Sequence, residues 1–440
     1  MIEKGFEHKD REDSGSAVQG RSDSVRNANS NFWGGFIAGI SAGIIVLSAV
    51  ALVLGYFFVK SVMPVASIEE REQTRDVESS FDNAHEFDFQ KIEKKILRIQ
   101  GIIEKYYLFE EDKNAVEDGI YSGFMKGLGD PYSVYYNEKD YKTLTEETTG
   151  VYQGIGAMVT HNPTTGVSTI SKVFKGSPSD EAGLKPGDII YKVDGEEVTG
   201  VDLDILVGTY IRGEEGTEVV LTVLRGEAAE EVELSIIRRA IEVPTVEHRM
   251  LENRTGYISV LQFDEITTEQ FRKAIEELKK EGMESLVIDL RDNPGGLLSS
   301  VVDMLDFIVP EGLLVYTADK DGKGDKYFAD QKVLVKLPMA VLVNANSASA
   351  SEVFAGAIKD HELGTIVGTK TFGKGIVQNL MPLGDGTALK ITTQHYYTPS
   401  GFDLHGKGIE PDLEVELEED AVIGEESDNQ LKEAMEYLNR

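Results

Sequence analysis

Residues 32–59 contain no charged side chain, and this run limits the topology of the chain more than any other feature. Lys60 closes it. The run exceeds the roughly 20 apolar residues that a helix needs to cross a bilayer. Trp33 lies near one end and Tyr56, Phe57 and Phe58 near the other, where aromatic side chains favour the membrane interface. We expect a single transmembrane helix over residues 31–60.

A cleavable signal peptide is the alternative for this segment, with a cleavage site after Ala66. The apolar run is too long for a signal peptide, which favours an uncleaved anchor. Basic residues stand on both sides of the run: Arg21 and Arg26 before it, and Lys60, Arg71 and Arg75 after it. The flanking charges therefore do not orient the anchor.

The chain is strongly acidic, with 44 Lys and Arg against 77 Asp and Glu and a formal net charge of −33. Such a charge repels phosphate backbones, so we expect no nucleic-acid partner. The 440 residues allow two or three domains. Cysteine is absent, which excludes disulfides, thiolate metal sites and a cysteine nucleophile.

Composition and hydrophobic period divide the chain into segments. We expect a polar disordered segment (1–30), the anchor (31–60), an acidic linker (61–86), a helical region (87–136), a β-rich domain (137–240), an α/β core (241–415) and an acidic C-terminal segment that ends in a helix (416–440).

The helical region carries one apolar stripe at spacings of three and four: Phe89, Ile92, Ile96, Ile99 and Ile103. This stripe is typical of core packing or of a dimer surface. Residues 87–128 and the C-terminal segment are therefore candidate surfaces for a homodimer.

Two later regions differ in the period of their elements. The first has β-like runs at 167–173, 188–193 and 219–224 and a helix at 203–211. The second alternates strands at 255–260, 285–290 and 339–344 with helices at 269–281, 297–308 and 349–359. This alternation predicts an α/β core.

The β-rich domain has an ordered series of turns. Gly154-Ile155-Gly156 is followed by Gly176-Ser177-Pro178, Ala182-Gly183-Leu184, Lys185-Pro186-Gly187-Asp188 and Asp194-Gly195. The series resembles a PDZ domain, which implies capture of protein C-terminal tails by strand addition. The resemblance places the tail carboxylate at the amides of Ile155, Gly156 and Ala157. It also suggests that Arg212 links peptide binding to the active conformation; a plain surface arginine is the alternative.

Three serines, Ser347, Ser349 and Ser351, follow an apolar strand at the start of the helix expected at 349–359. A serine at this place can cap the helix. The same place offers a nucleophile exposed amides and the positive end of the helix dipole, which stabilise an oxyanion. For any one of the three serines taken alone the cap is the favoured role, and the residues alone do not choose among the three.

Lys374 stands in a glycine turn, Gly373-Lys374-Gly375. With Gly368 the turn nearly matches a phosphate-binding loop, but Gly375 replaces the Ser or Thr that binds magnesium, so the nucleotide hypothesis fails. An apolar setting can instead lower the pKa of such a lysine to about 7–8, where it acts as a base. Gln378 lies on the same face and can orient the neutral amine by a hydrogen bond.

Several motifs together resemble the carboxy-terminal processing peptidases, the tail-specific serine proteases. They are the run from Asn346 to Glu352, Phe372-Gly373-Lys374-Gly375 with Gln378, Leu290-Arg291-Asp292-Asn293-Pro294-Gly295-Gly296, Tyr397-Thr398-Pro399-Ser400-Gly401 and Gly408-Ile409-Glu410-Pro411-Asp412. The resemblance covers roughly residues 90–415. It implies a multidomain α/β (α+β) fold in which a PDZ domain is inserted beside a crotonase- or ClpP-like protease core.

For the site, the resemblance implies that Ser349 is the nucleophile, with Lys374 and Gln378 completing a Ser-Lys-Gln arrangement. The oxyanion hole would use the amides of Gly295 and Ala350. The family implies no cofactor and no metal, substrates with accessible C-terminal tails, and a catalytic part outside the cytoplasm, which leaves residues 1–30 inside.

Two other hypotheses remain. A Ser-His-Asp triad would use Asp289 with one of His361, His395 and His405, none of which lies in a motif that explains its position. A non-catalytic PDZ scaffold or sensor would bind peptides without cutting them. Metal catalysis has less support, since no His-Glu-X-X-His or comparable cluster is present.

Overall fold

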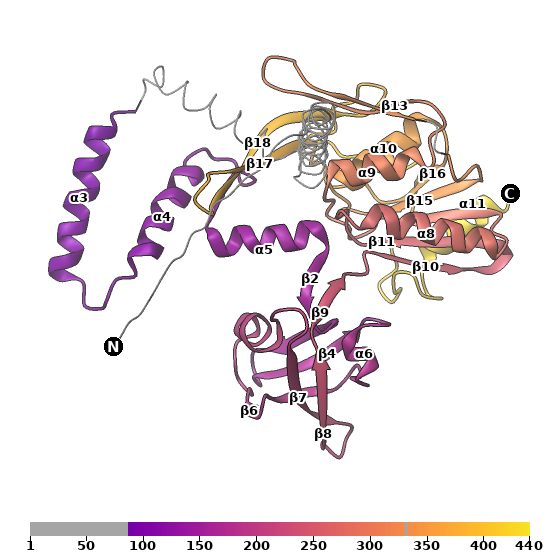
Figure 1. Cartoon of the computed structure of the whole chain (residues 1–440). Coiled ribbons are helices and arrows are strands. Elements are labelled where there is room, and N and C mark those ends of the chain that lie inside the picture. Colours follow the sequence, from indigo (N-terminus) through magenta and orange to yellow (C-terminus); the bar gives the residue numbers. More distant parts are fainter. Residues whose placement is uncertain (1–86, 331–332) are drawn as a thin grey trace, which may run out of the picture. The chain divides into compact units, whose positions relative to one another are not determined.

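The computed structural model describes residues 87–330 and 333–440 (Figure 1). The expected segments 1–30, 31–60 and 61–86 lie outside these residues, so the anchor stays a prediction. Within the described residues, no helix combines the length and the apolar character that crossing a bilayer requires. The chain divides into two units after Glu104.

The helical region contains α3 (Phe89–Tyr106) and α4 (Lys113–Lys126). Asp112 begins α4 by accepting the backbone N–H groups of Asn114 and Ala115. The apolar stripe lies on a helix as predicted, yet α3 buries none of its residues in the described structure. Phe89 is 60% exposed and Ile99 is 49% exposed. Within the described residues the stripe thus packs into no core, and core packing and a dimer surface both stay predictions.

Short elements connect this region to the rest of the chain. They are β1 (Val134–Tyr136) and α5 (Glu138–Thr149). Asn137 caps α5, and Gly150 ends it in the left-handed conformation that favours glycine.

The β-rich domain begins and ends with an antiparallel pair of strands, β2 (Val151–Gly154) and β9 (Arg239–Glu242). Between them lie β3 (Ala157–Asn162), β4 (Val167–Val173), α6 (Pro178–Glu181), β5 (Ile189–Val193), β6 (Glu196–Glu197), α7 (Leu203–Ile205), the π-helical turn η2 (Leu206–Ile211), β7 (Glu218–Arg225) and β8 (Glu230–Ile237). The sheet order is β3-β4-β5-β7-β8, with β6 beside β5. The predicted helix at 203–211 is present as α7 and η2.

The α/β core is built on a six-stranded sheet of order β10-β11-β12-β15-β16-β19, parallel except for β10. Its strands are β10 (Val246–Met250), β11 (Thr255–Val260), β12 (Ser285–Asp289), β15 (Met339–Val343), β16 (Thr365–Gly368) and β19 (Leu413–Glu414). Its helices are η3 (Glu252–Arg254), α8 (Thr267–Lys280), α9 (Leu298–Asp306), α10 (Ala350–Asp360) and α11 (Asn429–Leu438). The predicted strand and helix alternation is confirmed.

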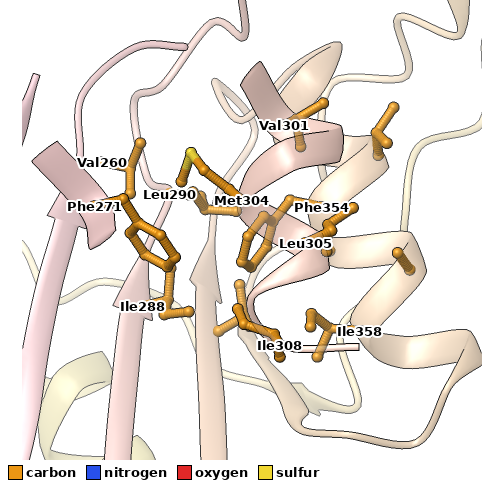
Figure 2. Close-up of a cluster of buried hydrophobic side chains, with 14 of the residues drawn as sticks. Val260, Phe271, Ile288, Leu290, Val301, Met304, Leu305, Ile308, Phe354 and Ile358 are labelled. Carbon is orange, nitrogen blue, oxygen red and sulfur yellow. The ribbon is translucent and has the colours of Figure 1, made fainter. Parts of the chain in front are cut away.

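The two faces of this sheet bury different helices, because successive strand residues point to opposite faces. Ile258, Ile288 and Val341 pack with α8, α9 and α10. Figure 2 shows this side, where Phe271 of α8 meets Phe354 of α10 edge to face with ring centroids 6.4 Å apart.

The opposite face is covered by the C-terminal helix α11. Tyr257, Val287 and Leu342 pack there against Leu431 and Ala434. The apolar face of α11 is thus used within its own chain, which argues against this helix as a dimer surface.

A second sheet has the order β1-β18-β13-β14, with β17 also paired to β18. Its other strands are β13 (Gly312–Ala318), β14 (Lys326–Ala329), β17 (Ile376–Pro382) and β18 (Ala388–Tyr397). This sheet matters for the site because the glycine turn of Lys374 leads directly into β17.

Candidate active site

Ser349 lies at the sharp turn between strand β15 and helix α10. Its backbone has φ +56° and ψ −114°, a region that L-residues other than glycine rarely adopt and that is often found at functional sites. Its side chain is partly exposed and lines a cavity of about 140 Å³. Such a strained strand-to-helix turn presents a hydroxyl at the helix N-terminus, where a nucleophile is needed.

The two neighbouring serines are fully buried and bonded to a facing loop. Ser347 Oγ donates to the carbonyl of Leu290 at 2.7 Å. Ser351 Oγ donates to the carbonyl of Asn293 at 2.9 Å. These two hydroxyls hold the loop at 290–296 against the start of α10, and Ser349 is the one of the three serines that lines the cavity.

Glu352, three residues into the helix, is a completely buried carboxylate. It accepts the backbone N–H of Ser349 at 2.9 Å and that of Lys374 at 2.8 Å. It also accepts Gly373 N–H at 2.7 Å and Thr371 Oγ1 at 2.6 Å. One side chain therefore joins the serine turn to the lysine turn.

Lys374 is half-buried, and its ammonium lies 4.6 Å from the centroid of the Tyr132 ring. Among the described residues, no hydrogen bond joins Lys374 Nζ to Ser349 or to Gln378. Gln378 lines the same cavity as Ser349 and donates to the carbonyl of Ile376 at 3.4 Å. Ser349 and Gln378 thus share a cavity, and Lys374 is joined to the serine turn through Glu352, but among the described residues no hydrogen bond links the three side chains.

The electrostatic setting of Lys374 suits a base. Burial lowers the pKa of its ammonium, and the positive charge of Lys390 lowers the pKa further. The carboxylates of Asp130 and Glu352 act in the opposite direction, but the pKa stays below its usual value. A lowered pKa raises the fraction of neutral amine near pH 7–8.

Gly295 lies directly against the serine turn with φ +103°. A Cβ at this position would stand 2.7 Å from Ser349 Cβ and 2.9 Å from Ala350 N, so only glycine fits. Gly295 N–H, however, donates to Asn293 Oδ1 at 2.8 Å. Ala350 N–H donates to no group in the described residues. The two residues expected to form the oxyanion hole thus lie side by side, and the N–H of Gly295 is engaged within its own loop.

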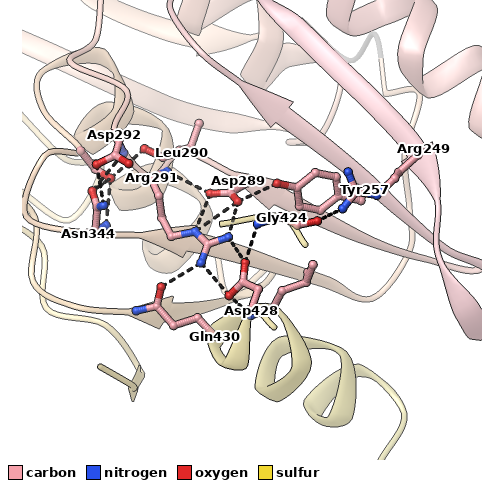
Figure 3. Close-up of polar contacts among 12 residues, drawn as sticks. Arg249, Tyr257, Asp289, Leu290, Arg291, Asp292, Asn344, Gly424, Asp428 and Gln430 are labelled. Atoms are coloured by element: carbon pink, nitrogen blue, oxygen red, sulfur yellow. Dashed lines mark hydrogen bonds and ion pairs between the residues drawn. The ribbon is translucent and has the colours of Figure 1, made fainter. Parts of the chain in front are cut away.

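The loop at 290–296 is anchored by Arg291, which is buried among acidic and amide side chains (Figure 3). Its guanidinium donates to Asp428 at 3.0 and 2.6 Å and to Gln430 at 2.8 Å. It also pairs with Asp289, which accepts the hydroxyl of Tyr257 at 2.8 Å. The C-terminal helix α11 thereby supports the loop that carries Gly295.

Tyr396, fully buried on β18, donates its hydroxyl to the carbonyl of Lys374. Burial, together with the charge of Glu352, raises the pKa of Tyr396 well above its usual value, while a hydrogen bond with Ser349 acts in the opposite direction. Tyr396 therefore stays neutral at physiological pH, and its hydrogen bond attaches the lysine turn to strand β18.

Among the described residues, no hydrogen bond joins His361, His395 or His405 to Ser349, although His395 lies 3.7 Å from Asp403. His361 lies past the far end of α10 and contacts the carbonyl of Leu313. Because Tyr396 points toward Ser349, its strand neighbour His395 points to the other face. Asp289 is engaged by Arg291. Within residues 87–330 and 333–440, no cluster of three or more His, Asp or Glu can hold a metal ion.

The phosphate-loop hypothesis also fails on the structure. The turn at 368–375 is followed by strand β17, whereas a phosphate loop opens a helix. Gly375 is needed for another reason, since a Cβ there would lie 2.6 Å from His405 N.

Three protein-family models match parts of this chain. The model of peptidase family S41 matches residues 254–415. A PDZ domain model matches 169–225, and a model of the activating protease CtpB N-terminal domain matches 49–140. The carboxy-terminal processing protease CtpB of Bacillus subtilis (strain 168) is 35% identical over 350 residues, which are 79% of this chain and 72% of the relative. The chain belongs to peptidase family S41.

The chain is also similar to a second curated protein and to a solved structure. The probable CtpA-like serine protease of Staphylococcus aureus (strain COL) is 34% identical over 381 residues, 86% of this chain and 72% of that protein. The solved photosystem II D1 C-terminal processing protease is 28% identical, with a TM-score of 0.45 and coverage of 80% and 94%. The protein is a serine-type peptidase of the C-terminal processing family with a PDZ domain, as the motifs predicted.

The PDZ domain of this S41 peptidase has a groove of about 480 Å³. The groove is lined by Ile155, Ala157 and Val159, by Val207 and Ile211 of the helical side, and by Thr143, Glu146 and Glu147 of α5. Gly156 has φ +80°, and a Cβ there would lie 2.3 Å from Ser177 Cβ. The predicted carboxylate-binding turn thus borders a real groove.

Arg212 lies in this groove but is already paired. Its Nη1 donates to Glu146 Oε2 at 2.8 Å, and its guanidinium lies 4.9 Å from the ring centroid of Tyr152. Its Nε is buried without a partner in the described residues. The cation that could attract a tail carboxylate is therefore held by the chain's own α5.

Several functional neighbours of the S41 site were missed by the sequence reasoning. Glu352 had a local signal, because Ser-X-X-Glu is the spacing of a capping box. Tyr132, Tyr396 and Asp428 had none, since each reaches the site from a distant segment.

Proposed function

We propose that this S41 peptidase is a membrane-anchored, extracytoplasmic endopeptidase that recognises C-terminal tails through its PDZ domain. Ser349 is the nucleophile and Lys374 the general base. The observation that carries this assignment is the shared carboxylate of Glu352, which ties the backbone of the serine turn to that of the lysine turn. The half-buried, glycine-flanked lysine with a lowered pKa supports its role as a base.

In the proposed reaction, neutral Lys374 takes the proton of Ser349 as Oγ bonds to the scissile carbonyl carbon. The amides of Gly295 and Ala350 bind the resulting oxyanion. The carbon–nitrogen bond then breaks, and Lys374 returns the proton to the leaving amine. Water hydrolyses the acyl-enzyme with the same base, which regenerates the serine.

Two groups must move before this reaction can occur. Lys374 Nζ has to leave the Tyr132 ring for Ser349, with Gln378 orienting the neutral amine. Asn293 has to release Gly295 N–H. Catalytic hydrogen bonds commonly tighten only when substrate binds, so we assign the observed arrangement to the resting enzyme.

The cavity beside Ser349 supports a preference at the cleaved bond. It is small, about 140 Å³, and apolar side chains of Leu297, Val353 and Ile376 line it. Small apolar residues, such as alanine or valine, suit such a pocket before the scissile bond.

The proposed partners are protein tails, the membrane and a second copy of the chain. A tail carboxylate would bind at Ile155, Gly156 and Ala157, with Arg212 as the nearby cation. The exposed apolar stripe of α3 supports a homodimer through the helical region. Protease accessibility in intact cells tests the orientation, and analytical ultracentrifugation with and without residues 87–128 tests the dimer.

Three variants test the chemistry. Ser349→Ala and Lys374→Ala should fold normally and show no turnover, whereas the double variant His395→Ala/His405→Ala should keep its activity. Loss of activity in the folded histidine variant would favour a triad. A serine-directed fluorophosphonate probe addresses the scaffold alternative, because a folded, tail-binding protein that never labels would be a binding module.

A further inference from the structure

The segment Gly129–Ser133, between α4 and β1, forms a hydrogen-bonded turn next to the lysine turn. Asp130 accepts Tyr132 N–H at 2.9 Å and Ser133 Oγ at 2.6 Å. Burial acts to raise the pKa of Asp130, but its hydrogen bonds, with Ser133 first among them, keep that pKa below its usual value. The turn is therefore organised around an ionised carboxylate.

This turn is attached to the catalytic sheet on both sides of Tyr132. Ser133, which is buried, accepts the N–H of Thr392 on β18 at 3.0 Å. The next residues form β1, which pairs with β18 from Val134↔Lys390 to Tyr136↔Ala388. Because β18 also pairs with β17, the strand after Lys374, the position of Tyr132 relative to that lysine is set by backbone pairing.

The Tyr132 ring faces the Lys374 ammonium at 4.6 Å from its centroid. This is the geometry of a cation–π contact, which favours the charged lysine over the neutral amine. The other charged groups that act on Lys374 are Lys390, which disfavours the ammonium, and Asp130 and Glu352, which favour it. The hydroxyl of Tyr396 donates to the backbone carbonyl of the lysine.

We propose that Tyr132 is a positioning residue for Lys374: its ring holds the ammonium in the resting enzyme, away from Ser349, until substrate binding draws the lysine to the nucleophile. Tyr132 lies in the part matched by the N-terminal domain model and outside the matched peptidase region. The N-terminal region would thus contribute directly to the control of the base. This inference rests on the proposed role of Lys374.

The test is the pH profile of Tyr132→Leu and Tyr132→Phe in the full-length protein. Removing the ring removes a contact that favours the protonated lysine, so the acid limb of kcat/KM should move to lower pH by roughly 0.5–1 unit in the leucine variant. The phenylalanine variant keeps the ring face and should match wild type. The rate of fluorophosphonate labelling against pH should move in the same way, without any dependence on the PDZ domain.

Tyr135→Leu is the matched control. Tyr135 lies three residues further on, and its hydroxyl donates to Asp118 at 3.0 Å. The acid limb of kcat/KM of Tyr135→Leu should therefore lie at the same pH as that of wild type. The proposal is overturned if the limb of folded Tyr132→Leu stays in place or moves to higher pH, or if Tyr132→Phe behaves like Tyr132→Leu. If Lys374→Ala retains turnover, the proposed base itself is wrong, which separates the two failures.

Discussion

The backbone N–H groups of Ser349 and Lys374 donate to the same oxygen, Oε2 of Glu352, at 2.9 and 2.8 Å. The other oxygen accepts Thr371 and Gly373. A strained serine turn and a glycine-flanked lysine turn, 25 positions apart in the chain, are therefore held in one geometry by a single buried charge.

Glu352→Gln should lower kcat by about 10–100-fold with a smaller change in KM. The amide keeps one acceptor oxygen but turns an NH₂ group toward two N–H donors, and it loses charge-assisted bonds worth roughly 1.5–3 kcal/mol each. Steady-state kinetics on a peptide with a free C-terminus measures the effect. Glu362→Gln, an exposed change in the same domain, should stay at wild-type values. Equal kinetics in the two variants would contradict the role of Glu352.

Asp428→Ala should reduce the free energy of unfolding by about 3–5 kcal/mol, because it leaves the buried Arg291 with one fewer counter-charge. Urea denaturation measures this loss. Glu433→Ala, which removes the more exposed ion pair with Arg440, should cost less than about 1 kcal/mol. Similar losses in both variants would show that the buried network adds no particular stability.

We also expect the stabilisation by Asp428 to depend on pH. Burial acts to raise the pKa of Asp428, but hydrogen bonds from Arg291 outweigh it and hold that pKa below its usual value. The stabilisation is therefore present above the unfolded pKa of about 4 and is lost as the pH falls through the lower folded pKa. The stability difference between wild type and Asp428→Ala should narrow in acid.

Glu146→Gln should strengthen the binding of a C-terminal tail by roughly 2–10-fold, since it frees Arg212 from its ion pair and makes the cation available to a carboxylate. Fluorescence anisotropy with a labelled peptide measures the affinity. The same peptide with an amidated C-terminus should show no gain. A gain with the amidated peptide would mean that Arg212 does not read the carboxylate.

Asp264 borders the same groove, and burial raises its pKa to about 6. A carboxyl group whose pKa is raised on folding destabilises the folded state, and this loss of stability increases as the pH rises from about 4 to about 6. Asp264→Asn should therefore be more stable than wild type above pH 7, by at most about 3 kcal/mol, with little difference near pH 4. Thermal unfolding at both pH values measures this; a variant less stable at pH 8 would contradict it.

Much of the fold was predictable, because it depends on patterns that are local in the chain. Strand β11 was predicted at its observed bounds, Thr255–Val260, since a short apolar run between turns favours a buried strand. The period of α3 predicted its helix but not its environment, since an apolar stripe packs equally well in a core or on a partner.

The candidate site divides in the same way. The sequence by itself determined the glycine turn of Lys374, the three serines at a helix start and the family that the motifs resemble. It could do so because each motif consists of residues that are close together in the chain. The family resemblance pointed to Ser349, but only the tertiary structure showed that Ser347 and Ser351 are buried and bonded to a loop. It also brought Tyr132 to the lysine. Burial and side-chain contacts between distant segments arise when strands pair. No local sequence pattern specifies which distant residue will contact a given side chain.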